Sequence, residues 1–231
     1  MLNKNRILAL IPARGASKSI KKKNLVKINN KTLIERMFNS LKKSKYIDKI
    51  VCSSENNQIL GHCKKLKLNS VKRPKKLASD NSDIYHTAKH CINFFKKKGE
   101  KFDILILAQP TSPFVKTESV NKIIKTLTIG KKYSSSQTIH KTPHNYHYLN
   151  SRVLNKGNLV KFKFLKERKN KVNKQKKPTT YSFGNLIACK VDKFLKSKDF
   201  FCQPCIGIIV DKFSSFDFDS KEDFEFLKKM N

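Results

Sequence analysis

Arg6-Ile-Leu-Ala-Leu-Ile-Pro12 is an apolar run, and it breaks into Ala13-Arg14-Gly15-Ala16-Ser17-Lys18-Ser19-Ile20-Lys21-Lys22-Lys23-Asn24, a segment of small residues and cations. This order is typical of an α/β fold in which a buried strand ends in a loop that receives the phosphates of a nucleotide. The small residues at 15–17 leave room for backbone N–H groups to approach an anion. Arg14 is more informative than the lysines, because arginine is rare in this chain.

Downstream of this stretch, apolar residues recur with helical spacing or in short continuous runs. Helices are expected around 33–41, 59–66, 84–95, 120–127 and 224–227, and strands around 49–53, 102–108, 133–139, 181–189 and 206–210. Strand, loop and helix follow one another with short connections, which predicts a doubly wound, mostly parallel sheet. Residues 140–177 are polar and irregular, with Val160, Phe162 and Phe164 alternating like a hairpin strand. We therefore predict a single domain, residues 1–231, with a protruding arm used for dimerisation.

The chain carries 51 Lys and Arg against 17 Asp and Glu among its 231 residues, a formal net charge of +34. Such a charge usually raises the question of nucleic-acid binding. Here the excess is lysine scattered along the whole chain beside many Asn, Ile and Phe, the residues of A/T-rich codons. Specific readers of bases also depend on arginine. We expect no specific nucleic-acid partner.

No apolar run approaches membrane-spanning length, and the N-terminal Met-Leu-Asn-Lys-Asn-Arg has no signal-peptide apolar region. We expect a cytoplasmic protein without a membrane partner. The six cysteines form no paired zinc ladder, because Cys202-Gln-Pro-Cys205 is a lone CxxC, and we expect reduced, mostly buried thiols. His86 and His90 lack a metal-binding pattern and are interpreted as surface or packing residues.

Asp217 and Asp219 alternate with Phe216 and Phe218 near the end of the chain. In an extended segment the phenylalanines face the core and the two carboxylates share the other face, about 7 Å apart. Such a pair suits Mg²⁺, which takes one or two carboxylates and completes its shell with water and phosphate. The alternative is a solvated strand edge followed by helix-start acids. The sequence Ser220-Lys-Glu-Asp223 resembles a capping box that begins the last helix.

The loop Gln109-Pro-Thr-Ser-Pro113 follows the second clear buried strand. Its amide and hydroxyls, on Gln109, Thr111 and Ser112, are suited to a ribose, a base or a sugar, and an ordinary polar turn between prolines is the alternative. Ligands of doubly wound sheets lie at the carboxyl ends of the strands, where both this loop and the loop 13–24 are expected. Walker A and GxGxxG motifs are absent.

Together these stretches resemble the N-acylneuraminate cytidylyltransferases, the CMP-sialic acid synthetases. Ile11–Lys18 followed by Lys23-Asn24 is similar to their IPARGGSKGIPxKN, and Gln109–Pro113 to their LQPTSPLR. Arg73-Pro74 with Leu77-Ala78 and Asp80 resembles RPxxLAxD, and Phe216–Asp219 resembles an xDIDT-type metal site. The four motifs occur in the family's order and span most of the chain.

The resemblance implies a Rossmann-like nucleotidyltransferase, usually a homodimer, that joins CTP to a nonulosonic (sialic-acid-like) 2-keto sugar acid and releases pyrophosphate. By position it implies catalytic roles for Arg14 and Lys23 and a Mg²⁺ site at Asp217 and Asp219. The residues it implies for the nucleotide are Arg14, Ser17, Lys18, Lys23, Asn24, Arg73, Gln109, Thr111 and Ser112. Those it implies for the sugar are Gln109, Gln175 and Tyr181.

Several positions depart from the family pattern. Ala16, Ser19 and Lys21 replace two glycines and a proline, Ser53-Ser54-Glu55 replaces STD, and Val115 replaces the arginine of PLR. These changes leave the identity of the sugar substrate more open than the binding of the nucleotide. The alternatives are a related enzyme for another acid, such as 3-deoxy-octulosonate, or for another nucleotide, and a non-catalytic relative that binds nucleotide or nucleic acid.

Overall fold

The computed structural model describes residues 5–17, 19–129 and 132–229. Within these ranges seven strands form the main sheet. In spatial order they are β11 (Cys205–Ile209), β7 (Ser135–Lys141), β10 (Tyr181–Lys190), β6 (Ile104–Ala108), β1 (Ile7–Pro12), β4 (Lys49–Ser54) and β5 (Asn69–Lys72). All neighbouring pairs are parallel except the two that involve β10, which runs antiparallel to β6 and β7. The predicted mostly parallel sheet is confirmed.

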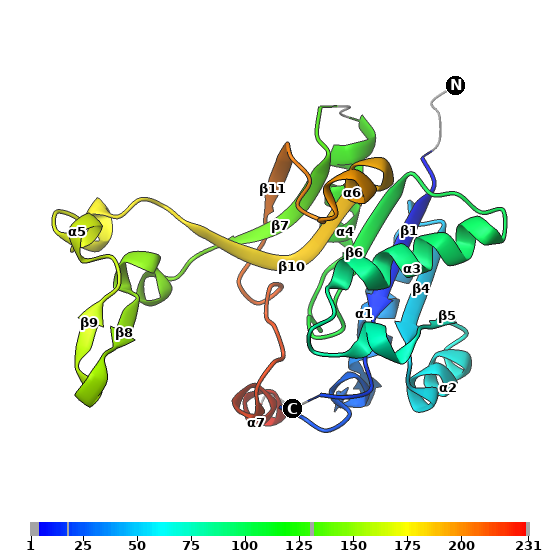
Figure 1. Ribbon diagram of the computed structural model, residues 1–231, viewed down its shortest axis with the longest axis horizontal. Helices are drawn as coiled ribbons and strands as arrows, with labels where there is room; N and C mark the ends of the chain where they lie inside the picture. The colour runs from blue at the N-terminus through cyan, green and yellow to red at the C-terminus, as the bar shows by residue number, and fades with distance from the viewer. Residues whose placement is uncertain (1–4, 18, 130–131, 230–231) are drawn as a thin grey trace.

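Helices cover both faces of the sheet (Figure 1). On one face lie α1 (Leu33–Lys42), α2 (Asn57–Lys65) and α4 (Thr117–Ile129), and on the other α3 (Ile84–Lys97) and α6 (Val191–Ser197). The central strand β1 explains this arrangement. Ile7, Ala9 and Ile11 pack into one core while Leu8 and Leu10 pack into the other, all of them buried. A strand covered on both faces needs a continuous apolar run, which is what 7–11 provides.

Side-chain caps begin several of the helices. Asp83 caps α3 by accepting the N–H of Tyr85 at 2.7 Å, and Thr32 caps α1 by accepting that of Glu35 at 3.1 Å. The predicted box at 220–223 is present in full. The N–H of Asp223 donates to Ser220 Oγ at 3.1 Å, and the N–H of Ser220 donates to Asp223 Oδ2 at 2.8 Å. It begins α7 (Lys221–Lys229), which packs Leu227 with Phe218 and the short hairpin of β2 (Lys27–Ile28) and β3 (Lys31–Thr32).

Between β7 and β10 the chain leaves the body and forms the arm, residues 142–180 (Figure 1). The arm contains a hairpin of β8 (Arg152–Leu154) and β9 (Val160–Phe162) and the single turn α5 (Leu165–Arg168). Arg152 and Arg168 both lie over the ring of Phe162, at 4.7 and 4.1 Å from its centroid. The hairpin leaves Leu154 and Leu159 more than 60% exposed.

Two details differ from the sequence-based prediction. Phe164 does not continue the hairpin strand, because it precedes α5, and α6 was not predicted at all. That helix buries only Val191 and Phe194, too few residues for a recognisable helical stripe. The six cysteines are free thiols, five of them buried, as expected. Among the described residues no helix is long and apolar enough to cross a membrane.

Candidate active site

A cleft of about 410 Å³ opens at the carboxyl ends of β1, β5 and β6. The polar and charged residues that line it come from loops far apart in the chain: Arg14, Ser17, Lys23, Asn24, Arg73, Ser79, Asp80, Ser82, Thr87, Gln109, Thr111, Asp217 and Asp219. Most of the residues proposed from the sequence for nucleotide and metal therefore meet in one place. Lys18 lies outside the described residues.

The loop after β1 follows a tight path against the exit of β4. A Cβ on Gly15 would lie 2.4 Å from Asn56 Nδ2, so only glycine allows this approach. Farther along, Asn24 is buried and donates its side-chain N–H to the carbonyl of Arg14 at 2.8 Å. Asn24 thereby closes the loop upon itself and brings Arg14 and Lys23 to the same cleft.

Each of these two cations faces a carboxylate across the cleft. Arg14 Nη1 lies 2.6 Å from Asp80 Oδ1, and Lys23 Nζ lies 2.6 Å from Asp219 Oδ1. The Arg14 and Asp80 side chains are 41% and 47% exposed, so this pair contributes little to stability. Because an exposed pair of this kind is weak, Arg14 is available for an incoming phosphate, with which arginine forms bidentate hydrogen bonds.

Arg73 forms a different type of pair. Its side chain is only 4% exposed, and its Nε and Nη2 donate to Glu55 Oε2 at 3.1 and 3.0 Å. Its Nη1 donates to Thr87 Oγ1 at 3.3 Å. The guanidinium is thus held rigidly at the floor of the cleft, beside Thr87, instead of reaching into solvent.

The loop 109–113 divides between cleft and core. Gln109 and Thr111 line the cleft, whereas Ser112 is fully buried and does not line it. Ser112 Oγ has no hydrogen-bond partner within the described part of the chain. The carbonyl of Thr111 accepts the N–H of Phe218 at 2.7 Å. This bond joins the loop to the segment that carries the two aspartates.

Asp217 and Asp219 alternate with buried Phe218 as predicted, and both carboxylates line the cleft. Desolvation raises the pKa of Asp217; the Thr111 hydroxyl opposes the rise and the charge of Asp219 adds to it. Two carboxylates that repel each other at the wall of this cleft form a donor set that fits Mg²⁺. Among the described residues no group of three or more His, Cys, Asp or Glu is placed to hold one metal ion. With two carboxylates as ligands, water and phosphate would complete the shell, as is usual for Mg²⁺.

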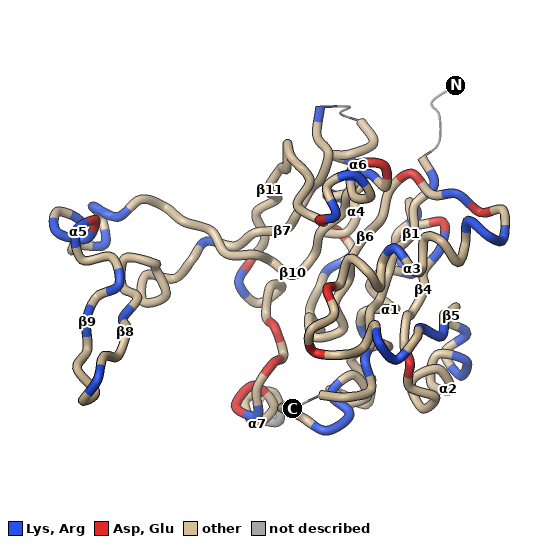
Figure 2. Tube along the Cα trace, viewed as in Figure 1, with Lys and Arg blue, Asp and Glu red and all other residues tan. Residues whose placement is uncertain are grey.

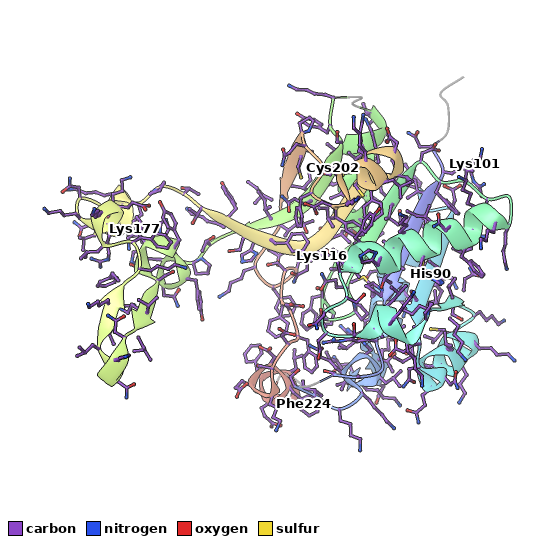
Figure 3. All side chains as sticks on the ribbon, viewed as in Figure 1. His90, Lys101, Lys116, Lys177, Cys202 and Phe224 are labelled. Atoms are coloured by element: carbon purple, nitrogen blue, oxygen red, sulfur yellow. The ribbon has the colours of Figure 1, made fainter. Side chains whose placement is uncertain are left out.

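Gln175 and Tyr181, proposed for the sugar, do not line this cleft. Both are exposed and lie in or at the base of the arm, Gln175 two residues from Lys177, which Figure 3 places away from the body. The structure therefore separates Gln175 and Tyr181 from the nucleotide residues within one chain, whereas Gln109, proposed for both substrates, lines the cleft.

Comparison with known proteins gives a family. The family model described as "Cytidylyltransferase" matches residues 8–227. The chain belongs to this cytidylyltransferase family. The chain is 29% identical over 229 residues to CMP-N,N'-diacetyllegionaminic acid synthase of Legionella pneumophila, covering 97% of this chain and 96% of the relative. It is 24% identical to N-acylneuraminate cytidylyltransferase of Escherichia coli, covering 96% of this chain and 51% of that protein.

The fold is similar to that of a solved structure. The solved structure of CMP:2-keto-3-deoxy-manno-octonic acid synthetase complexed with CTP superposes with a TM-score of 0.72 at 11% identity, covering 97% of this chain and 98% of that one. At this identity the likeness supports the Rossmann-like fold alone.

Sequence reasoning assigned no role to four polar residues that line the cleft, Ser79, Asp80, Ser82 and Thr87, nor to Glu55 beside it. Asp80 belongs to a motif quoted for the resemblance. Acidic residues are scarce in this basic chain, so its acidic side chain could have marked it as functional. Glu55 follows a strand end, where functional side chains gather. Thr87 lies inside α3 with no sequence feature to mark it.

Proposed function

We propose that this cytidylyltransferase is a CMP-nonulosonate synthetase of the N-acylneuraminate cytidylyltransferase type, which joins CTP to a sialic-acid-like 2-keto sugar acid. The observation that supports it most is the cleft itself, which brings Arg14 and Lys23 together with Asp80, Asp217 and Asp219 beside the strand ends. The two curated relatives named above act, by their names, on sugar acids of this class.

In this proposal the anomeric hydroxyl of the sugar acid attacks the α-phosphorus of CTP. A new oxygen–phosphorus bond forms, the bond to pyrophosphate breaks, and the hydroxyl proton passes to solvent. Arg14 and Lys23 leave Asp80 and Asp219 for the phosphate oxygens and neutralise their charge. Catalysis by these residues is positioning and electrostatic stabilisation of the charged transition state.

Asp217 and Asp219 would hold Mg²⁺. When bound, the ion neutralises charge on the phosphates and on the leaving pyrophosphate. The Lys23 ammonium lies 2.6 Å from the Asp219 carboxylate and compensates its negative charge when no Mg²⁺ is bound. Gln109 and Thr111, on the stiff loop between two prolines, orient the substrates at the same edge of the cleft.

We further propose a homodimer built through the arm. The exposed apolar side chains of the arm hairpin suit a partner surface. Gln175 and Tyr181 do not line the cleft of their own chain, and Lys177 of the arm lies away from the body (Figure 3). A second copy that receives the arm would bring these two residues to the sugar. The free thiols fit a reducing cytoplasm as the place of action.

The test is pyrophosphate release from CTP and Mg²⁺ with sialic, legionaminic, pseudaminic and 3-deoxy-octulosonic acids. Turnover with a nine-carbon acid is the expected result. Turnover only with the eight-carbon 3-deoxy-octulosonic acid would replace the proposal with the related synthetase, and no turnover with any acid would refute it. RNA binding that weakens steeply with salt, without CTP binding, would favour the non-catalytic alternative.

A further inference from the structure

Glu55 is the one carboxylate among the described residues that hydrogen-bonds to the first loop and to the buried arginine of the cleft together. Its Oε1 accepts the backbone N–H of Gly15 at 2.6 Å, and its Oε2 accepts two N–H groups of Arg73 at 3.0 and 3.1 Å. Both partners belong to the walls of the cleft or of the space next to it. Glu55 itself is not among the cleft-lining residues, so it acts through them.

The contact with Gly15 changes how the first loop works. A backbone N–H that donates to a carboxylate at 2.6 Å is not available to a phosphate. The loop is therefore not a cradle of free amides at Gly15. It is a segment fixed from behind by Glu55, which leaves the side chain of Arg14, the next residue back, to meet the anion in front.

The neighbouring turn makes this support rigid. Asn56 caps α2 by accepting the N–H groups of Gln58 and Ile59 at 2.9 and 3.2 Å, and its own N–H donates to Ser54 Oγ at 3.1 Å. Gly15 packs directly on the Asn56 side chain. The helix N-terminus at α2 is occupied by its own cap and does not serve as an anion site.

The ion pair itself argues for a role in geometry more than in stability. The Arg73 and Glu55 side chains are 4% and 13% exposed, and burying such a pair often gives no more stability than apolar residues would. What it supplies is orientation, because both oxygens of one carboxylate are committed to different elements. Resting on the proposed function, we infer that Glu55 is a positioning residue that aligns the first loop and Arg73 as one nucleotide-binding unit.

Glutamate has the reach for this task. Aspartate is one methylene shorter, so Glu55→Asp keeps the charge but shortens the reach toward Gly15 and Arg73. The Glu55→Gln variant keeps the side-chain length but loses the charge. Its amide NH₂ group would face either the Gly15 N–H or the Arg73 guanidinium, and neither of these donors can accept a hydrogen bond from it. Asp48→Asn is the matched control, since Asp48 Oδ2 accepts the N–H of Ile7 at 2.8 Å at the opposite end of the same strand.

The experiment measures the Kd for CTP by calorimetry, the Tm, and amide hydrogen exchange of residues 13–17 in the ligand-free protein. We expect Glu55→Gln to raise the Kd by about tenfold or more, which is the usual effect of leaving charged hydrogen-bonding groups unpaired. Glu55→Asp should give a smaller rise. Asp48→Asn should change the Kd by less than about threefold even when its Tm falls as much. The amides of the first loop should exchange faster in Glu55→Gln only.

Unchanged CTP affinity and unchanged loop exchange in Glu55→Gln, at a Tm loss like that of Asp48→Asn, would overturn the inference and reduce Glu55 to a structural ion pair. If the unsubstituted protein binds no CTP, the proposed function fails on its own. Loop exchange in the ligand-free variants then still decides whether Glu55 positions the loop: faster exchange supports it and equal exchange overturns it.

Discussion

The cleft and the arm use positive charge in opposite ways. The cleft is lined, among the described residues, by three cations (Arg14, Lys23, Arg73) and three carboxylates (Asp80, Asp217, Asp219). The arm, residues 142–180, carries eleven Lys and Arg and a single acid, Glu167. Figure 2 shows basic residues spread along the arm and acidic ones along the segment that leads from β11 to α7. In a chain with a net charge of +34, acids mark the site better than cations do.

The energetics explain why. An exposed lysine is fully hydrated and does not destabilise the fold, so the A/T-rich codon bias can place lysines over any exposed surface. A carboxylate kept beside another carboxylate is unfavourable, and Asp217 and Asp219 are such a pair. Hydrogen bonds to Thr111 and within the capping box of α7 hold the segment that carries these two aspartates. A bound cation would relieve the repulsion between the two carboxylates.

The largest effect expected on this contrast is at Arg14. Arg14→Ala should lower kcat/KM for CTP by about a hundredfold or more, because a charge stabiliser of the phosphates is lost. Arg14→Lys should recover part of the loss, since lysine keeps the charge but not the planar, bidentate geometry. Steady-state pyrophosphate release measures both.

Lys161→Ala in the arm is the matched control, an exposed cation of β9 removed with the same change in net charge. It should change kcat/KM by less than about twofold. Equal losses at Arg14 and Lys161 would mean that overall positive potential, and not the cleft geometry, attracts the nucleotide.

The next effect is on the metal. Asp219→Ala should raise the Mg²⁺ concentration needed for half-maximal turnover by about tenfold to a hundredfold or more. Losing a residue that only hydrogen-bonds to a metal ligand already lowers metal affinity by about that factor. Asp192→Ala, an exposed acid on α6 paired with Lys193, serves as the control and should leave that concentration unchanged. A Mg²⁺ dependence equal to that of the unsubstituted enzyme would show that the metal assignment at Asp219 is wrong.

The arm is tested by its apolar residues. Leu154→Asp should weaken the proposed dimer by about tenfold or more, because an unpaired carboxylate would enter an apolar interface. Sedimentation or light scattering over a dilution series reads this directly. Ile129→Asp is the control, since Ile129 is 82% exposed at the end of α4, outside the arm. If both variants stay dimeric, the arm hairpin is not the interface.

Most of the fold and much of the cleft were predictable from local signals. The apolar run at 7–11 predicted the central strand, the alternation of Phe and Asp predicted which side chains at 216–219 turn inward, and the box at 220–223 predicted the start of α7. These features depend on residues within a few positions of one another. The reversed direction of β10 does not, because strand pairing is decided by contacts far apart in the chain.

The same reason explains what the sequence concealed in the site. Glu55 lies 40 residues from Gly15 and 18 from Arg73, so no short motif contains this triad. Ser112 and Thr111 are adjacent and chemically similar, yet one is buried and the other lines the cleft. The direction of a side chain at a strand exit depends on packing that only the folded chain provides.

The smallest expected effect is on stability, at Asp217, where a substitution should raise the Tm while lowering turnover. Desolvation raises the pKa of this carboxyl, so the folded chain binds its proton more readily than the unfolded chain does. Stability therefore falls as the pH rises from the ordinary aspartate pKa of about 4 through the raised value. Asp217→Asn removes that loss, and at pH 7 without metal its Tm should exceed that of the unsubstituted protein by about 1–3 °C.

This gain should shrink as the pH is lowered, because protonated Asp217 is as neutral as asparagine. Turnover should fall in the variant, and Mg²⁺ should raise its Tm less than it raises that of the unsubstituted protein. Calorimetric scans from pH 4 to pH 7, with and without Mg²⁺, provide the comparison. A Tm difference that stays constant with pH would show that Asp217 titrates alike in both states, and the cleft would then impose no electrostatic cost on its acids.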